Sequence, residues 1–228
     1  MTRPDGVDVG LRELGERRPF PREALAVHAR DAARALLGAL VVRDLDGHEV
    51  VARVVETEAY REDDPASHSH AGRTARSEPM FWRPGTAYVY RSYGVHWCAN
   101  VAVEAPEVGA AVLLRAAVVL RGAPLVGQRR PTVRSPRELL RGPGNLTRGL
   151  AIDAPTHDRG DLIEGVGGLR LQTDGWGPPP AAVRWGPRVG VSRAAERPWR
   201  AWVADTPEVS RYVRSPRALA PMDDPTGR

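Results

Sequence analysis

The chain has 228 residues, of which 42% are hydrophobic, and its formal net charge is +5 with a sequence pI of about 10.1. This length and apolar content exclude a wholly disordered protein, and the basic balance favours an anionic partner such as nucleic acid over an acidic small molecule alone. All 33 basic side chains are arginines, so a Schiff-base mechanism would have only the α-amino group to use as its amine.

Both ends of the chain have the composition of poorly ordered segments. Residues 1–20 mix charge, Gly and Pro and lack the apolar stretch of a secretion signal, and residues 213–228 are similar. No apolar run approaches the roughly 20 residues that span a bilayer. The single cysteine, Cys98, excludes an internal disulfide. We therefore expect a cytoplasmic protein with one folded domain over residues 21–212, between a disordered arm and a disordered tail.

The first predicted elements are a helix and a hairpin. Apolar side chains recur at helical spacing over residues 22–37, and Gly38 supplies a stop. Two β-branched segments, residues 39–43 and 50–60, flank the turn signal Asp46-Gly47 and predict antiparallel strands.

A second hairpin is predicted from residues 86–91 and 95–103, with Tyr93 near its tip. Residues 110–120 read as a buried strand, and Ser135 begins a capping-box pattern for a brief helix. Residues 165–186 read as loop with one strand near residues 169–172, and further strands are predicted at residues 188–192 and 199–204. Hairpins outnumber βαβ patterns, so we expect a single α+β domain built on a curved, mainly antiparallel β-sheet with a protruding hairpin and flanking short helices.

The strand predicted over residues 50–60 carries candidate chemistry. Its alternation places Glu56, Glu58 and Tyr60 on one face and, on the other, Val55, Thr57 and Ala59. A carboxylate on such a face serves as a general base toward water if the face opens on a cleft, and is a solvated surface group if it does not. His68 and His70 follow closely, so these histidines and glutamates form either a metal site or isolated surface groups, and no Cys/His ligand set of diagnostic spacing accompanies them.

The second hairpin carries a further set of candidates. Tyr88 and Tyr90 point the same way, and the facing strand turns His96, Cys98 and Asn100 away from its apolar residues. An aromatic at the tip, Tyr93, is placed either to wedge between base pairs or to pack on its own hairpin. Arg115 lies in an apolar strand, so it requires an ion-pair partner or a polar cavity.

These segments together resemble the alkyladenine (3-methyladenine) DNA glycosylase family. The resemblance extends in order over about three quarters of the chain and is carried by five motifs: Val54-Val55-Glu56-Thr57-Glu58-Ala59-Tyr60, His68-Ser69, Met80-Phe81-x-x-Pro84-Gly85-Thr86-x-Tyr88-Val89-Tyr90-x-x-Tyr93-Gly94, Cys98-x-Asn100-Val101 and Val112-Leu113-Leu114-Arg115-Ala116.

The resemblance implies a role for each matching residue. Glu58 would deprotonate the attacking water, which Arg115 and the main-chain carbonyl of Val189 would help to hold. The remaining roles are a base pocket walled by Tyr60, His68 and Tyr90 and edged by Asn100, an intercalating Tyr93, and DNA contacts from Arg73, Thr74 and Met80. The chain has Asn145 where the family often has a basic residue, which removes a phosphate contact that Arg141 or Arg148 would have to replace.

The implied activity is that of a monofunctional DNA glycosylase in base excision repair. It would act as a monomer on double-stranded DNA, flip out alkylated or deaminated purines, and hydrolyse the N-glycosidic bond without a metal or organic cofactor. Two alternatives stay open at this point: a non-catalytic DNA-damage-binding protein, and a metal-dependent hydrolase that uses Glu56, Glu58, His68 and His70.

Overall fold

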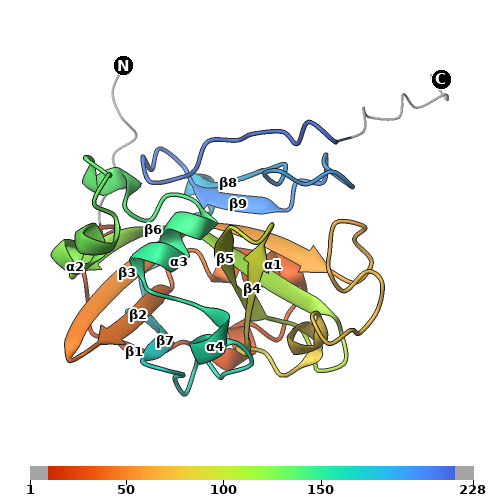
Figure 1. Ribbon diagram of the computed structural model, residues 1–228, viewed down its shortest axis with the longest axis horizontal. Helices are drawn as coiled ribbons and strands as arrows, with labels where there is room; N and C mark the ends of the chain where they lie inside the picture. The colour runs from red at the N-terminus through yellow and green to blue at the C-terminus, as the bar shows by residue number, and fades with distance from the viewer. Residues whose placement is uncertain (1–9, 219–228) are drawn as a thin grey trace.

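The computed structural model describes residues 10–218, which form an α+β fold around one antiparallel sheet (Figure 1). The sheet has nine strands in the order β1-β7-β2-β3-β6-β5-β4, and β9 pairs with both β3 and β8. Every strand pairing in this part of the chain is antiparallel. The predicted fold class is confirmed.

The first hairpin joins β2 (Leu40–Leu45) to β3 (His48–Arg61), as predicted. Asp46 and Gly47 adopt φ angles of 54° and 78°. Two consecutive positive φ angles match the twist of the flanking strands, and Asp-Gly tolerates them. The turn therefore sets the register that carries through the long strand β3.

The second hairpin joins β4 (Ala87–Ser92) to β5 (His96–Ala102), which pairs in turn with β6 (Ala110–Arg121). Tyr93 and Gly94 turn the chain with φ angles of 49° and 70°. Both the hairpin and the buried strand predicted at residues 110–120 are confirmed.

The helix predicted over residues 22–37 is wrong as one continuous element. The segment forms a 3₁₀ turn at Arg22–Ala24 and then α1 (Ala29–Ala35). The break occurs because the His28 ring accepts a hydrogen bond from the N–H of Arg30, while the Glu104 carboxylate accepts from the N–H of Ala29. These two acceptors satisfy free N–H groups of the helix and fix its start at residue 29.

Several short elements were not predicted. They are α2 (Ala123–Arg129), α3 (Pro143–Gly149), α4 (Ala154–His157), β8 (Val183–Gly186) and the 3₁₀ turns Glu78–Phe81 and Pro180–Ala182. The brief helix after Ser135 is a 3₁₀ turn, Pro136–Glu138, without the expected side-chain cap. β7 (Leu169–Thr173) and β9 (Arg200–Val203) match the predicted strands, whereas residues 188–192 form turn and coil.

The disordered arm expected over residues 1–20 is wrong for residues 10–20. Leu11 and Phe20 are buried, and β1 (Arg18–Pro19) pairs with β7. The expected tail begins as exposed coil, but the carbonyl of Val213 accepts a hydrogen bond from Gly190. Residues 1–9 and 219–228, on which the rest of both expectations falls, lie outside the described residues. Among residues 10–218, no helix is both long and apolar enough to cross a bilayer.

The two faces of the central strands have different surroundings. On β3, Thr57 donates from Oγ1 to the carbonyl of Ala33 in α1, 2.8 Å away, and Ala59 belongs to the main core. Glu58 and Tyr60 alternate with these residues and face the other way. One face of β3 and β6 thus packs on the core and α1, and the opposite face carries the polar groups described below.

Candidate active site

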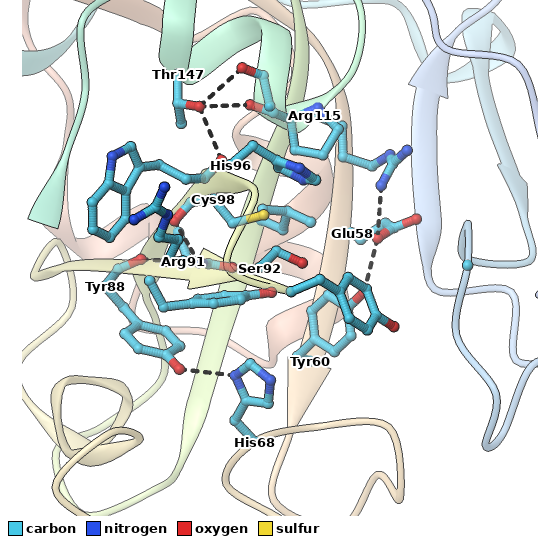
Figure 2. Close-up of a pocket in the computed structure, with 18 of the residues that line it drawn as sticks. Glu58, Tyr60, His68, Tyr88, Arg91, Ser92, His96, Cys98, Arg115 and Thr147 are labelled. Atoms are coloured by element: carbon cyan, nitrogen blue, oxygen red, sulfur yellow. Dashed lines mark hydrogen bonds and ion pairs between the residues drawn. The ribbon is translucent and has the colours of Figure 1, made fainter.

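A groove of about 1550 Å³ follows the outer face of the sheet and is the largest hollow among the described residues. Its lining comes from β3, β4, β5 and β6, from the start of α3, and from the loop that follows β8. Figure 2 shows that side chains from these separate segments converge on the same space.

Two β-bulges aim the charged groups at this groove. Val54 pairs with Ala117 and Glu56 with Ala116, so Val55 is an extra residue on β3. Thr57 then pairs with Leu114, which leaves Arg115 as an extra residue on β6. Bulges of this kind re-aim side chains and interrupt the regular alternation. Val55 therefore joins a different buried cluster from Ala59, contrary to the predicted sharing of a face.

Glu58 is completely buried and three groups hold its carboxylate. Oε1 accepts the main-chain N–H of Val189 at 2.7 Å, and Oε2 accepts the hydroxyl of Tyr60 at 2.8 Å. Nη1 of Arg115 lies 3.2 Å from Oε2. A buried charge needs such partners, and a carboxylate has about four lone-pair sites, so one site remains for a further donor.

Arg115 lies between two carboxylates, as Figure 2 shows for Glu58. Its Nε donates to Oε1 of Glu56 at 2.9 Å. Burial alone would lower the pKa of Arg115, but the carboxylates of Glu58 and Glu56 outweigh it and raise this pKa. Arg115 therefore stays charged and balances the two acids.

Aromatic rings form the wall beside Glu58. The ring centres of His68 and Tyr90 are 4.7 Å apart at an angle of 75°, and those of Tyr88 and Tyr90 are 5.2 Å apart. His68 Nδ1 lies 2.8 Å from the Tyr88 hydroxyl. Tyr60 completes the wall at the carboxylate, as Figure 2 shows.

The wall is uncharged at neutral pH. Burial lowers the pKa of His68 to about 4, with a further contribution from Arg76, and burial raises the pKa of Tyr88 to about 12. Burial and the Glu58 carboxylate raise the pKa of Tyr60 as well. The rings therefore offer neutral, electron-rich faces to the contents of the groove.

Arg188 supports the wall from behind Tyr60. Its guanidinium carbon lies 4.7 Å from the centre of the Tyr60 ring, and it forms a buried ion pair with Asp64. Because the next residue is Val189, this ion pair also anchors the loop that reaches Glu58. The strand predicted at residues 188–192 does not form, and the Val189 N–H bonds to Glu58 instead of to a neighbouring strand.

The tip of the β4–β5 hairpin presents apolar surface at the edge of the groove. Tyr93 is 87% exposed and Val95 is 75% exposed, although both line the groove. An aromatic side chain so exposed gains nothing from the fold of its own chain. Its position suits an inserted wedge better than a packed turn residue.

The structure brings most of the predicted site residues together. Those that line the groove are Glu58, Tyr60, His68, Met80, Tyr90, Tyr93, Asn100, Arg115 and Val189. The Asn100 side chain is fixed by a 2.9 Å hydrogen bond from its nitrogen to the Tyr88 carbonyl. Arg73 and Thr74 are not in the lining, because Arg73 pairs with Glu107 and Thr74 forms a turn with Ser77.

Sequence reasoning did not assign some groove residues. Tyr88 shares the alternation of Tyr90, and that signal was sufficient to place it in the pocket. Arg76 is exposed, and its guanidinium carbon lies 5.0 Å from the centre of the Tyr90 ring. Arg130 and Arg148 line the far end of the groove, whereas Arg141 does not.

The histidines and glutamates considered as a metal site do not cluster. Glu56 is bound to Arg115 and Arg200, His68 to Tyr88, and His70 to the carbonyl of Glu62. No group of three or more His, Cys, Asp or Glu side chains that could hold a metal ion occurs in residues 10–218.

Comparison with known proteins gives a consistent relationship. A family model described as methylpurine-DNA glycosylase (MPG) matches residues 23–207. A protein of Mycolicibacterium fortuitum named "Putative 3-methyladenine DNA glycosylase" is 49% identical over 197 residues, covering 83% of this chain and 96% of that protein. Proteins with the same name from Rhodococcus jostii and Mycobacterium tuberculosis are 48% and 45% identical, covering 83% and 87% of this chain and 84% and 96% of their own.

Proposed function

The chain belongs to the methylpurine-DNA glycosylase family, and from this membership we propose that it is a DNA-3-methyladenine glycosylase that acts in base excision repair. It flips an alkylated or deaminated purine out of double-stranded DNA and hydrolyses the N-glycosidic bond. The observation that carries the proposal is a buried carboxylate, Glu58, beside a wall of tyrosines in a groove edged by an exposed tyrosine. This arrangement matches the needs of base flipping followed by hydrolysis.

The first step is insertion of the hairpin tip into the duplex. Tyr93 fills the gap that the flipped nucleotide leaves, because unstacking a base requires an apolar filler. The base enters the groove between Tyr60 and the pair of rings formed by His68 and Tyr90. Asn100, fixed by Tyr88, stands at the pocket edge and excludes the exocyclic amino group of guanine.

An alkylated purine is favoured in this pocket by its charge. Purines alkylated at N3 or N7 are cationic, and a cation over a tyrosine face gains roughly 0.5–2 kcal/mol. The neutral state of His68 avoids repulsion with this cation. A cationic base is also a good leaving group, since it departs as a neutral molecule.

Hydrolysis uses the remaining acceptor site on Glu58. A water molecule donates to this carboxylate and its oxygen attacks C1′ of the sugar, with the Val189 carbonyl and Arg115 helping to hold it. The bond from C1′ to the purine nitrogen breaks with its electron pair on the base, and Glu58 takes the water proton. The same carboxylate stabilises the positive charge that develops on the sugar in the transition state.

The chemistry stops at base release. The chain contains no lysine, so the side-chain amine that would form a Schiff base with the sugar and cleave the strand is missing. The product is an abasic site in an intact strand. We further propose that the protein acts as a monomer in the cytoplasm, since one chain supplies the whole groove.

The experiment that tests this function is incubation of the full chain with methylated duplex DNA. Chromatography of the supernatant is expected to detect free 3-methyladenine, with the same yield in an excess of chelator and with strand breaks only after alkali. Retention of damaged DNA without base release would instead identify a binding protein. Loss of release on chelation, restored by added metal, would identify a metal-dependent hydrolase.

A further inference from the structure

The segment that follows β9, residues 206–213, contacts the charges behind the groove without lining the groove itself. We call it the C-terminal segment. It lies almost wholly beyond residues 23–207, which the family model matches. In Figure 1 it is the blue chain that passes over β9 and β8.

Ser210 is the residue of this segment that reaches the buried charges. Its main-chain N–H donates to Oε2 of Glu56 at 2.7 Å, and its hydroxyl donates to Oε1 at 2.7 Å. The same hydroxyl accepts from Nη2 of Arg115 at 3.1 Å, and the Ser210 carbonyl accepts from Nη2 of Arg200 at 2.7 Å. Ser210 thus connects all three charged groups.

Glu56 and Glu58 compete for Arg115. Glu56 is completely buried, and besides Ser210 it accepts Nε of Arg115 at 2.9 Å and Nε of Arg200 at 2.7 Å. The two donors from Ser210 satisfy part of the Glu56 charge. Without its hydroxyl, Glu56 lacks one donor and Nη2 of Arg115 lacks its acceptor, so the guanidinium moves toward Glu56 and away from Glu58.

A second contact of the C-terminal segment acts on the opposite side of Glu58. The carbonyl of Val213 accepts the N–H of Gly190 at 3.1 Å. Gly190 follows Val189, whose N–H holds Oε1 of Glu58. Both supports of the Glu58 carboxylate, Arg115 and Val189, are therefore tied to residues 206–213.

We propose that Ser210 is a positioning residue for base excision, which holds Arg115 against Glu58 and so fixes the carboxylate that receives the water proton. The proposal rests on the function proposed above for Glu58. Ser210 touches neither the base nor the water. Its effect falls on the rate of hydrolysis and leaves the binding of damaged DNA unchanged.

The test compares Ser210→Ala, Ser210→Thr and the wild type in single-turnover base release from a duplex with one lesion. Small displacements of a reacting group cost up to about a hundredfold in rate, and we expect roughly a ten- to hundredfold loss for Ser210→Ala with an unchanged dissociation constant. The acid limb of its pH–rate profile moves to higher pH, because a withdrawn Arg115 favours the protonated form of the base. Ser210→Thr keeps the hydroxyl and restores both rate and profile.

Ser215→Ala is the matched control, since the Ser215 hydroxyl contacts only the N–H of Arg217. Base release by the wild type and this control, together with a wild-type rate and pH profile in Ser210→Ala, would overturn the positioning role alone. A rate loss in Ser210→Ala that follows a lowered melting temperature, without movement of the acid limb, would also overturn it. Absence of base release in the wild type would refute the proposed function instead.

Discussion

The main-chain N–H of Val189 donates a hydrogen bond of 2.7 Å to Oε1 of Glu58. This contact joins the loop after β8 to the middle of β3 and orients the carboxylate toward the groove. The family resemblance assigns a role to the carbonyl of Val189, and the structure adds a role for its N–H. One peptide unit is thus placed to hold the carboxylate on one side and to offer an acceptor to water on the other.

We expect Tyr93→Ala to weaken binding to lesion-containing duplex by roughly tenfold or more, since stacking of an aromatic ring on a base contributes about 1–3 kcal/mol. The melting temperature should not change, because the side chain is 87% exposed. Tyr93→Phe keeps the ring and should bind like the wild type. Fluorescence anisotropy with labelled duplexes measures all three, and equal affinities for the alanine and phenylalanine variants would exclude the wedge.

Arg148 should contribute to binding without contributing to lesion choice. It is exposed and lines the groove, so Arg148→Ala should weaken binding to damaged and undamaged duplex alike. One lost phosphate contact lowers the slope of log K against log salt by about 0.9. Arg34→Ala is the control, because α1 packs on the core face of β3. An unaltered slope in Arg148→Ala would remove this residue from the footprint.

His68 should make the folded protein sensitive to mild acid. Its pKa is about 4 in the folded chain against an ordinary value of 6.5, so the unfolded chain binds more protons between these two values. The free energy of unfolding therefore decreases as pH falls through this window. Urea unfolding at about pH 7 and about pH 5 should show a smaller decrease for His68→Asn than for the wild type. The exposed-ring variant His70→Asn should keep the full decrease, and equal decreases in the wild type and His68→Asn would contradict the assignment.

The buried ion pair of Arg188 and Asp64 should be necessary for stability. Both side chains are fully buried, and Arg188→Met leaves the Asp64 charge without its main partner, a change that costs about 3–5 kcal/mol. The double variant Arg188→Met with Asp64→Asn should recover part of the loss. Arg184→Met replaces an exposed arginine nearby on β8 and should unfold like the wild type in urea. A single variant as stable as this control would show that the pair is dispensable.

The hairpins could be predicted because their turns depend on local chemistry. Asp46-Gly47 and Tyr93-Gly94 supply the positive φ angles at the two turns. The short helices lack enough apolar repeats to show a period. α3, for example, begins at a proline and is held by a bond from Thr147 to the Trp97 carbonyl, a contact that no local pattern encodes.

The site was predictable to the same extent. Strand alternation placed Glu58 with Tyr60, and the family motifs supplied the pocket. The support of Arg115 depends on two bulges and on Ser210, which is 154 residues from Glu56 in the sequence. Such long-range pairings follow from the tertiary fold, so they could be found only in the structure.

The central claim is that the Glu58 carboxylate receives the proton of the attacking water. The measurement that tests it most directly is single-turnover base release by Glu58→Gln on a duplex with one alkylated purine. Loss of a general base costs roughly 10²–10⁴-fold, so we expect release to fall by that factor while the affinity for the same duplex is retained. Glu49→Gln, the same change at the far end of β3, should release base at the wild-type rate, and undiminished release by Glu58→Gln would contradict the account.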